Sequence, residues 1–374
     1  MRKQTISLCM IVKDEEDCIE NCLSSVINVV DEIIIVDTGS LDNTVNICNS
    51  FGAKIYSYTW NNNFSSARNY GLQFATGDWI LWLDADEKMD TEDGRKLKKY
   101  LNQNNNEDVI CVQLINYLGG VEDLNNSYCM DQQRIFRNFK GINFTNTIHE
   151  TLSLNGVVKK IKFTDIKILP IKVYHFGYMD SRVLYKKKSQ RNLEILQREV
   201  LKEDHSPWVE YHLASELYNI KEYYLSFYYI NVSIKKFLEQ EELPPPLIYL
   251  LKYSILFNIG DLNTICLAID HAISLYPDYV DLIFLKGKIL FKNKDYTNAL
   301  RSFEKCIKLK GGSSSIYLSL KGTGSFISWY YKGRCLEHMN NIQGAKLAYQ
   351  TSLLAYPNYT PAKEALSNIR LYHV

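Results

Sequence analysis

The stretch Trp79-Ile-Leu-Trp-Leu-Asp-Ala-Asp86 places five apolar residues directly before two carboxylates. Such a short apolar run is typical of a strand that is buried on both faces of a sheet. Upstream of it, strands alternate with helices: we predict strands at Ile6–Val12, Glu32–Asp37 and Lys54–Tyr58, and helices at Glu15–Val29, Asp42–Phe51 and Ser65–Ala75. This alternation predicts βαβ units and a parallel sheet.

Three polar segments follow three of these strands. They are Lys13–Glu15, Asp37–Ser40 and Asp84–Asp86. In open α/β sheets, ligands bind at the carboxyl ends of the strands, where these segments should meet. The sequence therefore predicts a binding site at one edge of the sheet.

The chemistry of these segments suits a phosphate ligand and a metal ion. Asp84 and Asp86 supply hard oxygen ligands of the kind that Mg²⁺ or Mn²⁺ prefers, although an acidic turn after a strand is also common. The turn after Asp37 lets backbone donors approach a ligand, or it simply precedes a helix capped by Asp42. Arg68, on the helix before the apolar strand, could reach the phosphates or the base of a nucleotide.

The chain after Tyr178 shows helical patterns to its end and repeats a spacing. A small residue is followed twelve positions later by another, with a large apolar residue four beyond: Ala214, Ser226 and Ile230; Gly287, Ala299 and Phe303; Gly333, Ala345 and Tyr349; and, more loosely, Tyr253, Ile265 and Ile269. Helical hairpins of the tetratricopeptide type show this pattern, and unrelated helices that pair by chance are the alternative. Packing in these hairpins would explain much of the surplus of 27 Tyr and 15 Phe.

We therefore predict an α/β catalytic domain at 1–180, a linker helix at 181–205 and a helical repeat domain at 206–374. A length of 374 residues fits two domains. The net charge of +1 disfavours nucleic acid as a partner. Nine cysteines without a CxxC pair indicate reduced thiols, and no apolar run reaches the roughly 20 residues of a membrane helix. We expect a cytoplasmic bacterial protein without an integral membrane segment, and association with a membrane through its partners is the alternative.

Several motifs in order carry a family resemblance. They are Val12–Glu16, Ile35–Thr44, Trp60, Phe64, Ala67–Asn69 and Leu83–Asp86, continued by Arg134–Arg137, His149-Glu150 and Tyr174–Tyr178. The first part resembles the nucleotide-sugar-binding half of glycosyltransferase family 2, which has a GT-A fold. Together with the helical repeats, the chain resembles the bacterial sublancin-type peptide S-glycosyltransferases. Asp14 departs from that group, which often has asparagine there, and this puts its contact with the nucleotide base in question.

The resemblance implies a metal-dependent, inverting transfer of a sugar from a nucleoside-diphosphate donor, UDP-linked in the first instance. The donor-site residues that it implies are Val12, Asp14, Glu15, Asp37, Thr38, Arg68, Asp84 and Ala85. Asp84 would contact the ribose or the metal, and Asp86 the metal directly. His175 would be a third metal ligand or a diphosphate contact, while a structural hydrogen bond is its alternative role.

The acceptor side needs a general base. Glu150 is the candidate, because it follows His149 in a loop that should face the donor site; His149 could orient it or act itself, and Asp131 is a weaker alternative. A solvated loop pair is the other interpretation. Lys188 and Arg191 either clamp the leaving diphosphate or form a solvated helix face.

The predicted function is sugar transfer to a peptide or protein acceptor, in its sharpest version a cysteine thiol of a bacteriocin precursor. The repeats would bind that acceptor, form a homodimer, or both. The alternatives are transfer to a cell-surface polysaccharide or flagellin, a catalytically inactive repeat scaffold, and a nucleotidyltransferase. The acidic segment Lys13–Asp17 disfavours the last, because it would repel a triphosphate.

Overall fold

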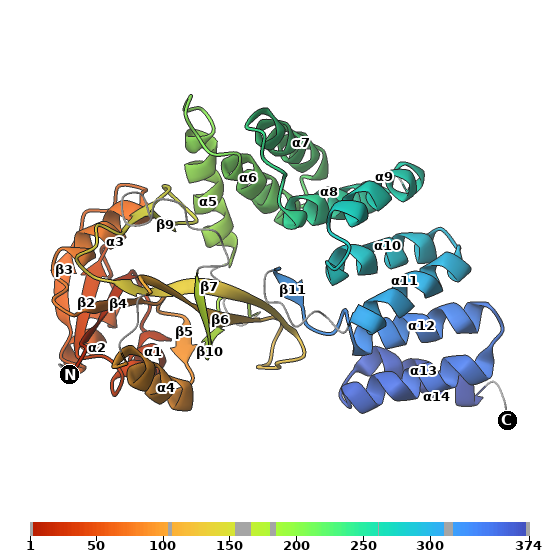
Figure 1. Cartoon of the computed structure of the whole chain (residues 1–374), viewed down its shortest axis with the longest axis horizontal. Coiled ribbons are helices and arrows are strands. Elements are labelled where there is room, and N and C mark those ends of the chain that lie inside the picture. The colour runs from red at the N-terminus through yellow and green to blue at the C-terminus, as the bar shows by residue number, and fades with distance from the viewer. Residues whose placement is uncertain are drawn as a thin grey trace. The chain divides into compact units, whose positions relative to one another are not determined.

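A computed structural model of the chain describes residues 3–103, 107–153, 166–179, 185–260, 262–309 and 317–371 (Figure 1). The chain divides into two compact units. The first comprises Met1–Glu122 and Cys129–Tyr185, and the second comprises Asp123–Tyr128 and Lys186–Val374. Residues 181–184, at the start of the predicted linker helix, lie outside the described part.

A mixed sheet forms the centre of the first unit. Its strands are β1 (Ile6–Val12), β2 (Glu32–Asp37), β3 (Lys54–Ser57), β4 (Trp79–Trp82), β5 (Glu87–Met89), β6 (Val109–Tyr117), β7 (Ser127–Arg137) and β10 (Lys167–His175). They lie in the order β3-β2-β1-β4-β7-β6-β10-β5. β1 is parallel to β2 and β4, β2 to β3, and β6 to β10, whereas β7 and β5 run antiparallel to β4 and β10. The predicted parallel sheet is confirmed for the four strands β1 to β4.

Successive side chains of a strand point to opposite faces of the sheet, and in β1 both sets include buried apolar residues. Helices therefore cover both faces. Leu8 and Met10 of β1 join one buried cluster, and Cys9 between them joins another. Helices α1 (Ile19–Val26), α2 (Thr44–Ser50) and α4 (Thr91–Leu101) contribute residues to the first cluster. Helix α3 (Phe64–Leu72) and the hairpin of β8 (Asn143–Thr145) and β9 (Thr151–Ser153) lie against the second.

The second unit is a series of helices (Figure 1). They are α5 (Tyr185–Glu199), α6 (Trp208–Asn219), α7 (Tyr223–Glu239), α8 (Pro246–Ile259), α9 (Leu262–Leu275), α10 (Val280–Lys292), α11 (Tyr296–Leu309), α12 (Phe326–His338), α13 (Ile342–Ala355) and α14 (Thr360–Leu371), with the short strand β11 (Ser319–Leu320) before α12. None of the described helices is long and apolar enough to cross a membrane.

Close packing between paired helices accounts for the repeat spacing. A Cβ atom added to Gly287 of α10 would lie 2.6 Å from the ring of Phe303 on α11, and Gly333 of α12 faces Tyr349 of α13 in the same way. Tyr349 and Phe303 are fully buried, as packing predicts. Packing does not explain Tyr224, which is 80% exposed, so the aromatic surplus is only partly a core feature.

Candidate functional site

The loops that follow β1 and β2 are tied to each other at the edge of the sheet. Thr38 donates its backbone N–H and its hydroxyl to the Val12 carbonyl, at 3.0 and 3.1 Å. Asp14 has a left-handed backbone, with φ 53°, and its Oδ1 accepts the N–H of Leu41 at 2.7 Å. The structure therefore brings Val12, Asp14 and Thr38 together, as the sequence predicted.

The carboxylate of Asp37 builds the turn that follows it. It accepts the N–H of Ser40 at 3.1 Å and that of Gly39 at 3.3 Å, and Gly39 adopts φ +107°, which favours glycine. Glu15 donates its N–H to the hydroxyl of Thr44 at 2.7 Å. In these contacts, the side chains of Asp37 and Thr44 accept hydrogen bonds from backbone N–H groups of the two loops. Nucleoside recognition by Asp37 and Glu15 stays a prediction.

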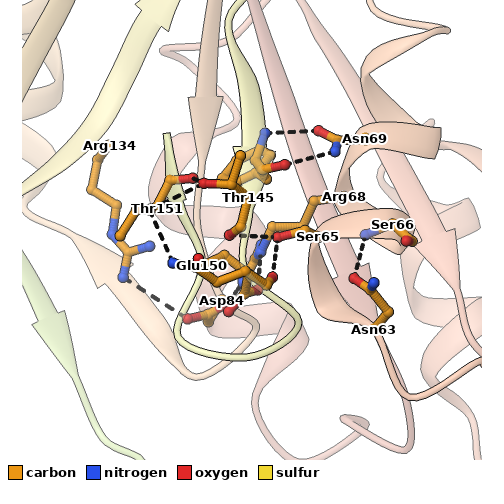
Figure 2. A network of polar contacts seen from close by, with 12 residues as sticks. Asn63, Ser65, Ser66, Arg68, Asn69, Asp84, Arg134, Thr145, Glu150 and Thr151 are labelled. Atoms are coloured by element: carbon orange, nitrogen blue, oxygen red, sulfur yellow. Dashed lines mark hydrogen bonds and ion pairs between the residues drawn. The ribbon is translucent and has the colours of Figure 1, made fainter. Parts of the chain in front are cut away.

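A chain of alternating charges joins Glu150, Arg68, Asp84 and Arg134 (Figure 2). The Arg68 guanidinium donates from Nε to Glu150 at 2.7 Å and from Nη2 to Asp84 at 2.6 Å. The side chains of Arg68 and Glu150 are 7% and 12% exposed, while that of Asp84 is 39% exposed. Arg68 therefore joins the predicted general base to the first carboxylate of the Asp84–Asp86 motif.

Arg134 of β7 continues this chain from the other side of Asp84. Its Nη2 lies 3.8 Å from Asp84 Oδ2 and forms a closer ion pair with Glu87, whose Oε2 accepts the backbone N–H of Asp84 at 3.0 Å. The Arg134 guanidinium lies 3.8 Å from the centre of the Trp82 ring, a cation–π distance. Its Nε and Nη1 are buried and find no hydrogen-bond partner among the residues that the structure describes.

The two arginines set the protonation of the carboxyl groups between them. Burial alone would raise the pKa of Asp84, but the charges of Arg68 and Arg134 outweigh it, and the Asp84 pKa is lowered. Burial also acts on Glu87, and together with the nearby Asp84 charge it outweighs Arg134 and raises the Glu87 pKa to about 7. Asp84 is thus held ionised, and Glu87 titrates near neutrality.

Helix α3 positions Arg68 and Glu150 by holding the β8–β9 hairpin (Figure 2). Asn69 pairs with the backbone of Phe144 through two hydrogen bonds, of 2.9 and 2.8 Å, in the manner of an extra strand. Ser65, four residues earlier on the helix, donates to the carbonyl of Thr145 at 2.8 Å. The segment around Arg68 therefore both carries the guanidinium and fixes the loop that ends at Glu150.

Asp86 and His175 form a second pair of functional groups. His175 ends β10 opposite Glu87 of β5, and its Nε2 lies 3.5 Å from Asp86 Oδ1. The other ring nitrogen, Nδ1, donates to Asn116 Oδ1 at 2.7 Å. In a neutral imidazole, Nε2 therefore points its lone pair at the Asp86 carboxylate. A proton or a cation can lie between Nε2 and this carboxylate.

The pKa of His175 reflects this neighbourhood. Burial alone would lower it, but the hydrogen bond and charge of Asp86 and the charge of Glu87 raise it above its ordinary value. An imidazole whose far nitrogen is fixed by a second group, beside a carboxylate, is also how proteins prepare histidine for a metal ion. The local chemistry of Asp86, His175 and Asn116 thus fits a divalent cation.

A cavity of about 300 Å³ adjoins this pair. It is lined by Asp17, Cys18, Asn21, Cys22, Ala85, Asp86, Glu87, Lys88, Glu122, Phe176 and Met179. Gly177 lies against the pair: a Cβ atom there would stand 2.6 Å from His175 Nε2 and 2.7 Å from Asp86 Oδ2. The close approach of the backbone requires glycine at this position.

The predicted ligand triad of Asp84, Asp86 and His175 is not assembled as a group. Within the described ranges no cluster of three or more His, Cys, Asp or Glu side chains is placed to hold a metal ion. Asp84 turns toward its arginines instead. The structure thus brings together Asp86 with His175, and Asp84 with Arg68 and Glu150.

Two of the remaining predicted residues belong to the first unit, His149 beside Glu150 and Asp131 on β7, and two belong to the second unit. His149 is exposed and has a left-handed backbone, with φ 54°, and Asp131 lies half-buried on β7. Lys188 and Arg191 are on α5 of the second unit, where Arg191 donates to Asn192 Oδ1 at 3.3 Å. Their predicted roles as base and diphosphate clamp stay predictions.

Comparison with known proteins places this site in a family. Residues 7–161 match the family model described as glycosyl transferase family 2, and residues 280–312 match a tetratricopeptide repeat. The N-terminal unit is a glycosyltransferase family 2 domain. The repeat domain predicted from the spacing of small residues is confirmed, and the chain combines this glycosyltransferase domain with tetratricopeptide repeats.

Two curated proteins and one solved structure are similar to this chain. A TPR repeat-containing protein of Synechococcus elongatus is 36% identical over 51% of this chain and 47% of its own length. The SPbeta prophage-derived glycosyltransferase SunS of Bacillus subtilis is 29% identical over 81% of this chain and 70% of its own. The crystal structure of S. aureus TarS has a TM-score of 0.39 at 17% identity, over 67% of this chain and 52% of that one. The match to the cyanobacterial relative thus spans about half of that protein.

Arg134, Glu87, Asn116 and Asn69 are the site residues that we did not predict roles for. Asn116 offers a signal in hindsight, since it is a polar residue near the end of the apolar strand β6. Glu87 follows Asp86 directly and could have been included with it. Arg134 and Asn69 stand in two of the motifs that carry the family resemblance, but their roles could not be derived locally, because their partners lie 47 and 75 residues away.

Proposed function

We propose that the chain transfers a sugar from a UDP-linked donor to a peptide or protein acceptor. The observation that carries this is the Asp86–His175 pair at the carboxyl end of the sheet, with Asn116 fixing the imidazole. Family 2 membership of this unit supports it. The tetratricopeptide repeats favour a peptide acceptor, because stacked helical hairpins present extended surfaces for protein segments.

Asp86 and His175 are the residues that would hold a Mg²⁺ or Mn²⁺ ion, with phosphate oxygens of the donor completing its shell. Such an ion would neutralise the charge of the leaving diphosphate. The carboxylate of Asp84 is already neutralised by Arg68 and Arg134, so its role differs from that of Asp86. We assign Asp84 to positioning Arg68 rather than to the metal.

Glu150 would take the proton of the acceptor as its nucleophile attacks the anomeric carbon and the bond to the diphosphate breaks. Arg68 donates to Oε1 of Glu150 at 2.7 Å. That contact leaves Oε2 to receive the proton. An acceptor thiol suits this base well, since a thiol loses its proton more readily than a hydroxyl, and a cysteine of a precursor peptide is the sharpest version of the proposal.

The test is release of UDP from UDP-sugars in the presence of Mn²⁺, with Mn²⁺ binding measured separately by electron paramagnetic resonance. We expect Asp86→Asn to abolish both. Asp108→Asn, which removes a carboxylate paired with Lys140 on the surface, serves as the control and should retain both. Pyrophosphate instead of UDP would show a nucleotidyltransferase, and absence of UDP binding by the native protein would show an inactive scaffold.

The acceptor is tested with the native enzyme and thiol-containing or hydroxyl-containing peptides. Mass spectrometry should show one added hexose or related sugar on a peptide. A product that resists the alkaline elimination expected of O-linked sugars and disappears in a Cys→Ser peptide would establish the thiol. Transfer only to polysaccharide would refute the peptide acceptor while leaving the donor chemistry intact.

A further inference from the structure

A cavity of about 490 Å³ lies among three helices of the repeat unit, far in the sequence from the donor site. Each of the three helices lines one side of the cavity. Its lining residues are Cys266, Asp270 and Ile273 of α9, Ile283, Lys286 and Leu290 of α10, and Asn298, Arg301, Ser302 and Lys305 of α11. The volume falls within the range of roughly 300 to 1,000 Å³ that ligand sites occupy.

The floor of this cavity is apolar. Ile273, Ile283 and Leu290 are 9%, 2% and 8% exposed, so a small part of each is open to a ligand. Ile283 and Leu290 are seven positions apart on α10, and they therefore lie on the same side of that helix. An apolar side chain of a ligand could rest on this floor.

The rim of the cavity carries an excess of positive charge. Lys286 is paired with Asp270, the single carboxylate among the lining residues. Arg301 and Lys305, four positions apart on α11, are both exposed and point to the same side. Arg301 donates to Asn298 at 3.2 Å, and in the described part of the chain neither Arg301 nor Lys305 forms an ion pair with a carboxylate. Two positive charges thus remain beside an apolar floor.

We propose that this cavity binds an acidic peptide segment, with an apolar side chain on the Ile273, Ile283 and Leu290 floor and a carboxylate between Arg301 and Lys305. Charge complementarity selects an acidic partner. The apolar floor favours a peptide over a free anion, and the lining residues include no aromatic ring on which a nucleic-acid base could stack. This inference does not depend on the proposed sugar transfer, because peptide binding needs no donor.

The experiment measures fluorescence anisotropy of a fluorescein-labelled decapeptide of alternating glutamate and leucine, titrated with the full chain. Matched peptides replace every glutamate by glutamine or by lysine. We expect saturable binding of the acidic peptide, at least tenfold weaker binding of the glutamine peptide, and affinity that falls as salt rises.

Arg301→Glu/Lys305→Glu should weaken binding of the acidic peptide at least tenfold, and Arg301→Gln/Lys305→Gln by an intermediate factor. Both sites are exposed, and far-UV circular dichroism confirms that each variant is folded. Lys308→Glu is the matched control, because Lys308 is exposed on the same helix and does not line the cavity. It should bind as the native chain does.

The proposal is overturned by equal binding of the native chain and the double Glu variant. It is also overturned by an equal loss in Lys308→Glu, which would indicate non-specific attraction to α11, or by the absence of saturable binding. Complete displacement of the peptide by millimolar inorganic phosphate would identify a site for small anions instead.

Discussion

Replacing Arg68 by methionine tests how much its ion pairs with Glu150 and Asp84 stabilise the first unit. Methionine keeps much of the side-chain volume but removes two charge-assisted hydrogen bonds, each worth about 1.5–3 kcal/mol. The bond to Glu150 counts nearly in full, because the Arg68 and Glu150 side chains are only 7% and 12% exposed. The bond to Asp84 counts for less, because Asp84 is 39% exposed and water screens its charge. We expect the free energy of unfolding to fall by about 3 kcal/mol.

Most of that loss should come from leaving the Glu150 carboxylate buried and unpaired. Adding Glu150→Gln to Arg68→Met removes the charge and should restore about 1–2 kcal/mol. If the effects of the two single substitutions on the free energy of unfolding simply added in the double variant, that result would contradict the pairing. This cycle therefore measures the contact between the two residues rather than the general sensitivity of the region.

Urea unfolding followed by tryptophan fluorescence is the assay, made specific to the first unit. Of the five tryptophans, Trp208 and Trp329 belong to the second unit, so both are replaced by phenylalanine in every protein compared. Arg95→Met is the matched control, since the ion pair of Arg95 with Glu92 is exposed at both ends. It should leave the urea midpoint unchanged. A midpoint for Arg68→Met equal to that of Arg95→Met would refute the reasoning.

Three further predictions concern single residues. Gly287→Ala should destabilise the repeat unit by about 1–3 kcal/mol, because the new methyl group would meet the buried ring of Phe303. Urea unfolding followed by circular dichroism measures this change. Loss of the effect in Gly287→Ala/Phe303→Leu would confirm the clash. Gly177→Ala should weaken Mn²⁺ binding at least tenfold by displacing His175 and Asp86, and unchanged binding would argue against this pair as ligands. Burial raises the pKa of Asp281 from 3.8 to about 6, so its contribution to stability is full below the lower value and is lost as the pH rises through the higher one. Asp281→Asn should therefore flatten the decline in stability of the repeat unit between about pH 4 and 6, and parallel curves for the two proteins would contradict the raised pKa.

The sequence predicted the strands more exactly than the helices beside them. β1 and β2 begin and end at the predicted residues, Ile6–Val12 and Glu32–Asp37. The first helix begins four residues later than predicted, at Ile19, because Asp14 takes a left-handed conformation and its loop bonds to the next one. Apolar runs report burial directly, whereas helix ends depend on tertiary hydrogen bonds that the local sequence does not show.

The repeat unit was predictable for a different reason. Small residues such as Gly287 and Gly333 are needed wherever a bulky ring of the partner helix lies against the backbone, and this requirement recurs with each hairpin. The predicted pattern is therefore a direct record of helix packing. Tyr224 is exposed, so the spacing of small residues gives no information about its role.

The candidate site shows why residue types alone could not assign roles. Asp84 and Asp86 are two positions apart at the end of one strand and look equivalent in the sequence. Strand β7 brings Arg134 to Asp84, and strand β10 brings His175 to Asp86, so the two carboxylates have opposite environments. Asp84 is neutralised by guanidinium groups and holds Arg68 against Glu150. Asp86 instead lies 3.5 Å from an imidazole nitrogen of His175. Strand order therefore decides which partner each carboxylate meets. Under the proposed function, the same order would give the cation to Asp86 and leave Asp84 to support Glu150 through Arg68.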